Sequence, residues 1–184
     1  MIYGVGLNDV GKVTDPVTKK KCKIYTMWLD MLRRCYSETY QNQHVKYKGC
    51  SVEPGWFKFS SFKDWVLSNK EYAENKQLDK DLLVKGNKLY SPETCTFISQ
   101  EINKFLTVNQ TKKSGLPVGV NKKSNRFQAV CNNPFTKKLE HLGYFSSAEE
   151  AHLAWKTKKQ EIAKIYADQE NNEEIKQALI EYFK

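Results

Sequence analysis

Residues 118–167 constrain the fold of this chain most, because a two-residue periodicity gives way to a helical one inside this stretch. Phe127, Ala129 and Cys131 recur at every second position, which places them on one face of an extended strand. The other face of that strand is left for solvent or a ligand. Ser147 and Glu150 then have the spacing of a capping box, which marks the start of a helix. The stretch therefore predicts three short strands packed on one helix.

The predicted helix has an apolar stripe that contains both small and large side chains: Ala148, Ala151, Trp155, Ile162 and Ile165. Small side chains let a helix approach a sheet closely, so we expect this stripe to face the strands. Residues 168–184 carry a net charge of −3 and form a second helical pattern with Ile175, Leu179, Tyr182 and Phe183. This C-terminal helix is expected to fold back on the protein or to dock on another copy of the chain.

The first half of the sequence predicts a second, helix-rich module. Residues 23–36 have a single apolar stripe, formed by Ile24, Trp28, Met31, Leu32 and Cys35. Residues 56–68 predict a second helix, which buries Phe62, Trp65 and Val66. Residues 78–84 and 95–98 predict two strands, and Ser99 has the position of a cap for a helix that carries Ile102, Phe105 and Leu106.

A polar segment without periodicity, residues 107–117, separates the two modules and contains Gly115 and Pro117. Its composition is typical of a linker. We therefore expect an α+β protein with a first domain at residues 1–106, a linker at 107–117, a sheet-and-helix domain at 118–167 and a C-terminal helix at 168–184.

Positive charge is concentrated in the same part of the chain as the predicted sheet. The formal net charge is +9, and residues 112–167 contain 11 basic and 4 acidic residues. Lys and Arg release counterions when they bind nucleic acid, so this charge favours an anionic partner. Solubility alone would also account for a basic surface, so charge does not decide the function.

The five cysteines are odd in number and irregularly spaced, which does not fit a disulfide framework. Four of them could supply zinc ligands, but no pair has the CxxC spacing of a zinc knuckle: Cys22, Cys35, Cys50 and Cys95. No apolar run reaches the ~18 residues that span a membrane, and the N-terminus lacks signal-peptide features. We therefore expect a cytoplasmic protein with reduced thiols and no membrane partner.

Residues 119–155 contain the patterns GVNKK, RFQAV and LGYFSSAEEAHLAW. These patterns resemble the APETALA/ethylene-response-factor DNA-binding domain, which occurs in transcription factors and as an appendage of HNH endonucleases of phages and mobile elements. The resemblance implies a three-stranded sheet in the major groove of double-stranded DNA. By position, it implies DNA contacts from Asn121, Lys122, Lys123, Arg126, Gln128 and His141. The family often has Arg at the first three of these positions and Trp at the last, so looser sequence readout is expected here.

Residues 23–103 resemble divergent HNH-like proteins of phages. The matching motifs are a Trp-containing helical half, LDKD at residues 78–81, YSPETC at 90–95 and Q..N at 100–103. In an HNH site, a strand–loop–strand–helix unit holds one divalent metal, usually Mg²⁺, against the scissile phosphate. By position, the resemblance implies that Asp79 and Asn103 bind the metal. Lys80 stands where the family has its general-base His.

The Lys80 replacement affects the predicted chemistry, since a neutral His takes a proton near pH 7 whereas an exposed Lys stays protonated. His44, in an upstream loop, is the remaining candidate for a base. Lys80 could instead contact a phosphate. In a purely structural alternative, Asp79 and Asp81 order a turn and bind Lys85 or Lys88.

These observations leave three hypotheses open. The first is a double-stranded DNA-binding protein of phage or mobile-element type, whose HNH-like half is degenerate or forms a second contact with DNA. The second is an active Mg²⁺-dependent DNA endonuclease with Asp79 and Asn103 at the metal and an unconventional base. The third is a protein-interaction module, such as a phage factor that binds a host protein, whose basic surface is incidental. DNA binding is common to the first two and is the function that we expect.

Overall fold

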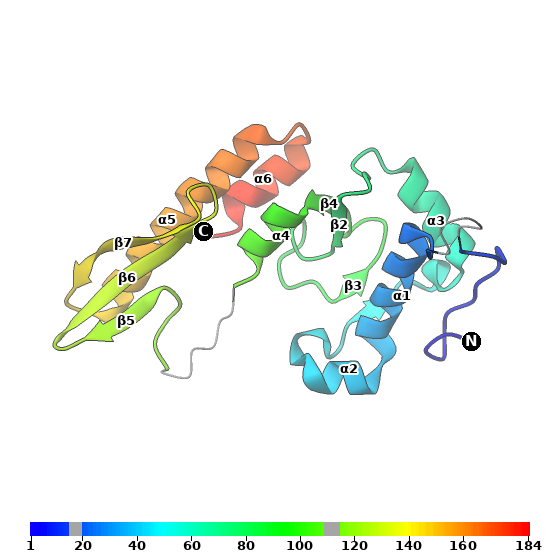
Figure 1. Ribbon diagram of the computed structural model, residues 1–184, viewed down its shortest axis with the longest axis horizontal. Coiled ribbons are helices and arrows are strands. Elements are labelled where there is room, and N and C mark those ends of the chain that lie inside the picture. The colour runs from blue at the N-terminus through cyan, green and yellow to red at the C-terminus, as the bar shows by residue number, and fades with distance from the viewer. Residues whose placement is uncertain (15–19, 109–114) are drawn as a thin grey trace. The chain divides into compact units, whose positions relative to one another are not determined.

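The computed structural model describes residues 1–14, 20–108 and 115–184, which form two compact units, Met1–Ser99 and Gln100–Lys184 (Figure 1). The protein has the expected α+β fold. The expected linker, residues 107–117, lies partly outside the described residues. The division falls before α4 (Gln100–Leu106), a helix that we expected to end the first domain. α4 belongs to the second unit because Phe105 packs on Tyr166 and Phe183, with ring centroids 5.2 and 5.3 Å apart.

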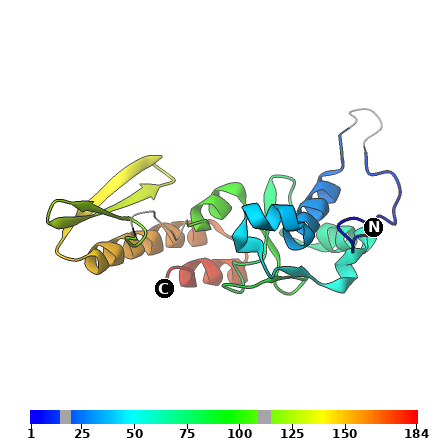
Figure 2. The same cartoon turned by 90° about the horizontal axis from the view of Figure 1, so that it is seen from below.

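The second unit contains the predicted three-stranded sheet. Its strands are β5 (Val120–Lys123), β6 (Arg126–Asn133) and β7 (Lys138–Phe145), which are antiparallel in that order. α5 (Ala148–Gln169) lies along one face of the sheet (Figure 2). Its capping box is confirmed, because Ser147 Oγ accepts the Glu150 N–H at 3.1 Å and the Glu150 carboxylate accepts the Ser147 N–H.

Small residues bring the sheet and α5 into close contact, as the sequence predicts. Val120 and Ala129 of the sheet and Ala148 and Ala151 of the helix are almost completely buried together. Gly119 precedes β5 with a φ of +81°, and a Cβ atom there would lie 2.2 Å from the Trp155 ring. The chain therefore needs glycine at this position for two independent reasons.

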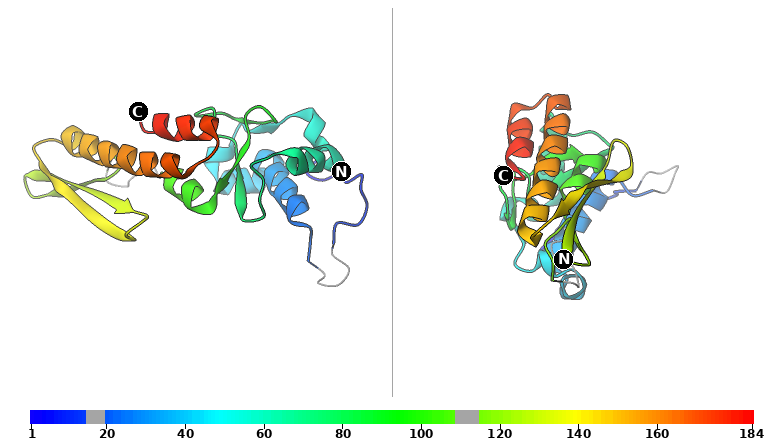
Figure 3. Two further views of the ribbon diagram at one scale, coloured as in Figure 1. Left: turned by 90° about the horizontal axis from the view of Figure 1, so that it is seen from above. Right: turned by 90° about the vertical axis from the view of Figure 1, so that its left-hand side faces the viewer.

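The prediction that Ile165 belongs to the buried stripe of α5 is wrong. Ile165 is 45% exposed, whereas its neighbours Ala163 and Tyr166 are buried. With 3.6 residues per turn, Ile165 lies outside the face of the helix that buries Ala163 and Tyr166. The C-terminal helix is α6 (Glu173–Glu181), which folds back alongside α5 and buries Ile175 and Leu179 (Figure 3). None of the helices in the described ranges is long and apolar enough to cross a membrane.

The first unit is built around α1 (Lys23–Tyr36), whose predicted apolar stripe is buried throughout. Trp28 donates a hydrogen bond from Nε1 to the carbonyl of Trp56 at 2.7 Å, within the 3₁₀ turn η2 (Pro54–Phe57). α3 (Phe59–Ser68) starts later than the predicted helix because that turn precedes it. Its Phe62 and Val66 are buried as predicted, and Trp65 is half-buried.

The rest of the first unit consists of short elements. α2 (Glu38–Gln43) and the 3₁₀ turn η1 (Val45–Tyr47) follow α1. β1 (Ser51–Val52) pairs in parallel with β3 (Leu89–Tyr90). β2 (Lys76–Asp79) pairs in antiparallel with β4 (Thr96–Ser99). The predicted strand at residues 78–84 is wrong beyond Asp79, because the Asp79 side chain bonds the next backbone amides and turns the chain.

Candidate nucleic-acid interface

The pairing register of β5 and β6 determines which side chains point away from α5. Residues directly opposite one another in an antiparallel sheet lie on the same face, and neighbours along a strand alternate. Val120 pairs with Ala129, and both are buried toward α5. The next pair, Asn121 and Gln128, therefore lies on the other face. By the same alternation, the pair Lys123–Arg126 lies on that face too, and both of its side chains are exposed.

A bulge in β7 extends this face to the third strand. Ala129 pairs with Gly143 but Val130 pairs with His141, so Leu142 is an extra residue. Leu142 packs toward the buried residues between the sheet and α5. The extra residue shifts the alternation, and both His141 and Tyr144 consequently lie on the face that points away from α5. Their ring centroids are 4.8 Å apart, which confirms that they share a face.

We call this surface the outer sheet face and define it by the residues that the register places there: Asn121, Lys123, Arg126, Gln128, Val130, Asn132, Leu139, His141 and Tyr144. It contains five of the six expected DNA-binding residues. The sixth is Lys122, which pairs with Phe127, so its Cβ leaves the strand on the side that faces α5. Its side chain is nevertheless exposed. Sequence reasoning missed Tyr144, which is 48% exposed. The Leu142-Gly143 pair was the available signal, since glycine inside a strand often marks a bulge.

The outer sheet face is positively charged, because it holds Lys123 and Arg126 and no carboxylate among the residues that define it. The single acidic residue of the three strands is Glu140, which pairs with Cys131 on the side toward α5. Glu140 forms an ion pair with Lys158 of α5 at 3.1 Å. A hydrogen bond from Asn133 and this ion pair lower the pKa of the Glu140 carboxyl. The negative charge of Glu140 is therefore neutralised by Lys158 on the side toward α5. It does not reduce the positive charge of the outer sheet face.

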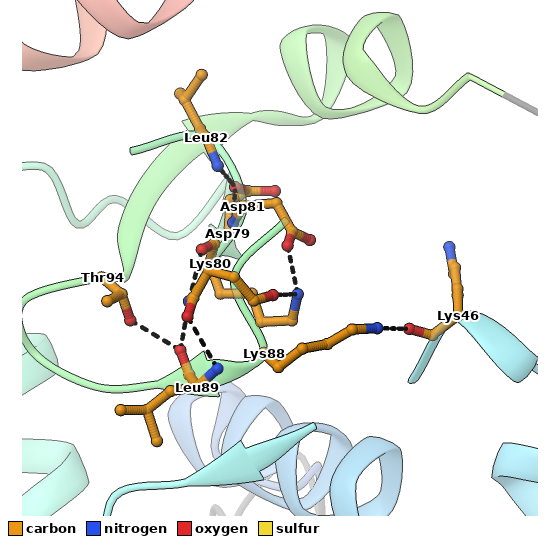
Figure 4. Close-up of polar contacts among 9 residues, drawn as sticks. Lys46, Asp79, Lys80, Asp81, Leu82, Lys88, Leu89 and Thr94 are labelled. Carbon is orange, nitrogen blue, oxygen red and sulfur yellow. Dashed lines mark hydrogen bonds and ion pairs between the residues drawn. The ribbon is translucent and has the colours of Figure 1, made fainter. Parts of the chain in front are cut away.

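The three residues that the HNH-like resemblance implies in catalysis lie in two different units. Asp79 and Lys80 are in the first unit, at the end of β2, whereas Asn103 is in α4 of the second unit. Asp79 Oδ1 accepts the backbone N–H groups of Asp81 and Leu82, at 2.8 and 2.7 Å (Figure 4). The Asp79 carboxylate thus orders the turn, as the structural alternative proposes.

The Lys80 side chain forms its contacts within the same turn. Its side chain is buried, and its Nζ contacts the Asp81 carboxylate at 2.5 Å and the Asn87 carbonyl at 2.7 Å (Figure 4). Asp81 therefore pairs with Lys80, and Lys88 donates instead to the carbonyl of Lys46. These two contacts hold the Lys80 Nζ inside the turn, which gives the side chain a structural role there.

The surroundings of Asp79 bear on its expected role as a metal ligand. Burial raises the pKa of the Asp79 carboxyl, although hydrogen bonds from Leu82 and Asp81 act against that rise. Among the residues that the structure describes, no group of three or more His, Cys, Asp or Glu side chains is arranged to hold a metal ion. The zinc and Mg²⁺ assignments, and the catalytic assignments of Asp79, Lys80 and Asn103, therefore stay predictions.

Burial also raises the pKa of the Cys35 and Cys95 thiols to about 12, so both are protonated near neutral pH.

The histidines outside the outer sheet face have other surroundings. His152 of α5 stacks on Trp155, and its Nδ1 lies 2.8 Å from the Val118 carbonyl. It therefore holds the start of the sheet on the helix. His44 is exposed between α2 and η1 and contacts Tyr40 at a tilt of 38°, with ring centroids 4.3 Å apart.

Comparison with known protein families, with curated proteins and with solved structures finds no match to this chain.

Proposed function

We propose that this protein binds double-stranded DNA through the outer sheet face. The observation that carries the proposal is the composition of that face, where two exposed cations and an exposed aromatic pair surround the half-buried amides of Asn121 and Gln128 without a carboxylate. Polyanion binding needs such a surface, because each cation that neutralises a phosphate releases a counterion.

The dimensions of the sheet suit the major groove. Three strands spaced about 4.8 Å apart measure about 10 Å between the outer strands, and the major groove is about 12 Å wide. Arg126 has the planar fork that reads guanine, and the amides of Asn121 and Gln128 match the donor and acceptor pattern of adenine. Lys123 is suited to a phosphate contact. The face therefore combines groups for phosphate attraction with groups for base recognition.

The proposal is tested by fluorescence anisotropy with a labelled duplex at fixed salt. Arg126→Ala and Tyr144→Ala should each weaken binding, and Lys164→Ala is the control because Lys164 is an exposed cation on α5. We expect about a 5- to 100-fold loss for Arg126→Ala, which is the range for one base contact. Lys164→Ala should bind like the unchanged protein. If Arg126→Ala and Tyr144→Ala do so as well, the outer sheet face is not the DNA-binding surface.

The geometry at Asp79 and Lys80 favours DNA binding without cleavage. Supercoiled plasmid incubated with the protein and Mg²⁺ or Mn²⁺ is therefore expected to stay supercoiled while it shifts on a gel. Nicking that disappears in Asp79→Ala would contradict this expectation and support the endonuclease. A complete lack of salt-sensitive binding would contradict both DNA binding and the endonuclease, and would leave the protein-interaction module.

A further inference from the structure

A second surface with nucleic-acid character lies in the first unit, where α1, α2 and η1 meet. Three aromatic rings form a cluster there: the tilted rings of Tyr40 and His44 have centroids 4.3 Å apart, those of Tyr40 and Tyr47 are 5.8 Å apart, and the His44 and Tyr47 rings meet edge to face at 6.5 Å. The two tyrosines are half-buried, whereas His44 is the exposed ring of the cluster. We call this surface the α2 corner and define it as Arg33, Tyr40, His44, Lys46, Tyr47 and Lys48.

Cations surround the rings of the α2 corner. The Arg33 guanidinium lies 4.7 Å from the Tyr40 centroid, and the Lys46 ammonium lies 5.1 Å from the Tyr47 centroid. Lys48 is exposed beside them. The nearby acids are Asp30, which pairs with Arg33 at 2.9 Å, and the exposed Glu38. Residues 30–48 contain four Lys or Arg and two acidic residues, so the corner keeps a net positive charge.

The backbone beneath the rings is fixed by Gln41. The last carbonyls of a helix lack partners inside the helix. Gln41 Nε2 donates to two of these carbonyls in α1, of Arg34 at 3.1 Å and of Cys35 at 2.7 Å, and also to the carbonyl of Tyr47. Lys88 adds a hydrogen bond to the carbonyl of Lys46 at 2.7 Å. The backbone that carries the ring cluster is therefore held in place before any ligand arrives, which lowers the entropic cost of binding.

Packing explains only part of this arrangement. Tyr40 and Tyr47 lie against the guanidinium groups of Arg33 and Arg34. The exposed His44, Lys46 and Lys48, in contrast, bury little surface. The exposed His44 ring leaves a face on which another flat ring can stack, and the cations around it can bind phosphates. Surfaces that bind unpaired nucleic-acid strands combine these two properties, because bases stack on aromatic rings while the backbone follows a basic groove.

We propose that the α2 corner binds single-stranded nucleic acid, with an unpaired base stacked on His44 and phosphates held by Arg33, Lys46 and Lys48. The ligand differs from that of the outer sheet face, since bases inside a duplex are already stacked and cannot lie on His44. The two surfaces therefore bind different forms of nucleic acid, and either can be lost without the other.

The test measures anisotropy of a labelled 12-nucleotide single strand, of a matched strand with abasic sites in its centre, and of a duplex. His44→Ala should weaken single-strand binding by about 5- to 100-fold, the range for one base–aromatic stack, and His44→Trp should restore it. The unchanged protein should prefer the base-containing strand over the abasic strand, and His44→Ala should remove that preference.

Charge is tested separately with a double variant, Lys46→Ala with Lys48→Ala, against Lys58→Ala with Lys70→Ala, which removes two exposed lysines elsewhere in the unit. Only the first pair should reduce the slope of log affinity against log salt, by about 1.4, because each phosphate contact with a single strand contributes about 0.7. Single-strand binding that is unaffected by His44→Ala and by the first pair would overturn the proposal, as would a lack of single-strand binding. Arg126→Ala should weaken duplex binding alone, so failure of the outer sheet face would be distinguishable from failure of the α2 corner.

Discussion

Lys159 is a buried cation on α5 whose described surroundings are apolar. Its Nζ donates to the Phe105 carbonyl at 2.6 Å and lies 3.5 Å from the Phe105 centroid and 4.6 Å from that of Phe183. Burial lowers its pKa to about 8, although Cys131 acts in the opposite direction. Because a free lysine titrates near 10.4, the unfolded chain binds more protons than the folded chain between these values.

The Lys159 contacts predict an unusual pH dependence of stability. The free energy of unfolding should rise from about pH 8 to about pH 10, because the folded state no longer has to bury a charge. Urea unfolding of the protein and of Lys159→Met isolates this effect from the titration of Cys131 and the tyrosines. The unchanged protein should gain on the order of 3 kcal/mol at most over the variant in that range. A constant difference between the two proteins would show that Lys159 titrates normally.

Asp79 also yields a residue-scale prediction. Asp79→Asn keeps an oxygen for the amides of Asp81 and Leu82 and removes a charge that burial disfavours. Asp79→Ala leaves both amides without that acceptor and should cost about 1–3 kcal/mol. At pH 7, Asp79→Asn should be at least as stable as the unchanged protein. Equal losses in thermal or urea unfolding for the two variants would argue against the turn-ordering role.

The raised pKa of Asp79 fixes the sign of its pH effect. Above pH 3.8 the folded chain keeps a proton on Asp79 that the unfolded chain has released. The free energy of unfolding should therefore fall as the pH rises from about 4 through the folded pKa, and this fall should be absent in Asp79→Asn.

At the scale of elements, Gly119 sets the distance between the sheet and α5. Gly119→Ala introduces both left-handed strain and a 2.2 Å contact with Trp155, whereas Gly115→Ala introduces strain alone, at a φ of +67° with open space around it. We expect Gly115→Ala to cost about 1–2 kcal/mol and Gly119→Ala about 1–3 kcal/mol more. Chemical denaturation followed by circular dichroism measures both. Equal losses would mean that the Trp155 contact relaxes without cost.

The sequence predicted elements whose periodicity is uninterrupted and missed those that depend on a single side chain. α1 has one continuous stripe whose predicted residues are all buried, and only Tyr25 beside it was not predicted. β2 ends at Asp79 because of two side-chain hydrogen bonds, which no periodicity reveals. The β7 bulge likewise changes which side chains share a face. Tyr144 was missed for that reason, although Gly143 gave a local signal.

At the scale of the whole molecule, the two units have separate tasks in this account. In our proposals, the outer sheet face of the second unit binds duplex DNA, and the α2 corner of the first unit binds single strands. Asn103 belongs to the second unit because α4 packs on α5 and the C-terminal segment through Phe105, which sequence order could not indicate. The LDKD motif was found from the sequence, but its role in a turn depends on contacts with Leu82 and Asn87 that follow it.

The central claim is that duplex DNA lies on the outer sheet face, and two adjacent lysines test it most directly. Lys123 lies on that face, whereas Lys122 starts from the side toward α5. The measurement is duplex affinity over a series of salt concentrations for Lys123→Ala and Lys122→Ala. We predict that Lys123→Ala lowers the slope of log affinity against log salt by about 1 and that Lys122→Ala leaves it nearly unchanged. A larger change for Lys122→Ala, or no change for either variant, would contradict the claim.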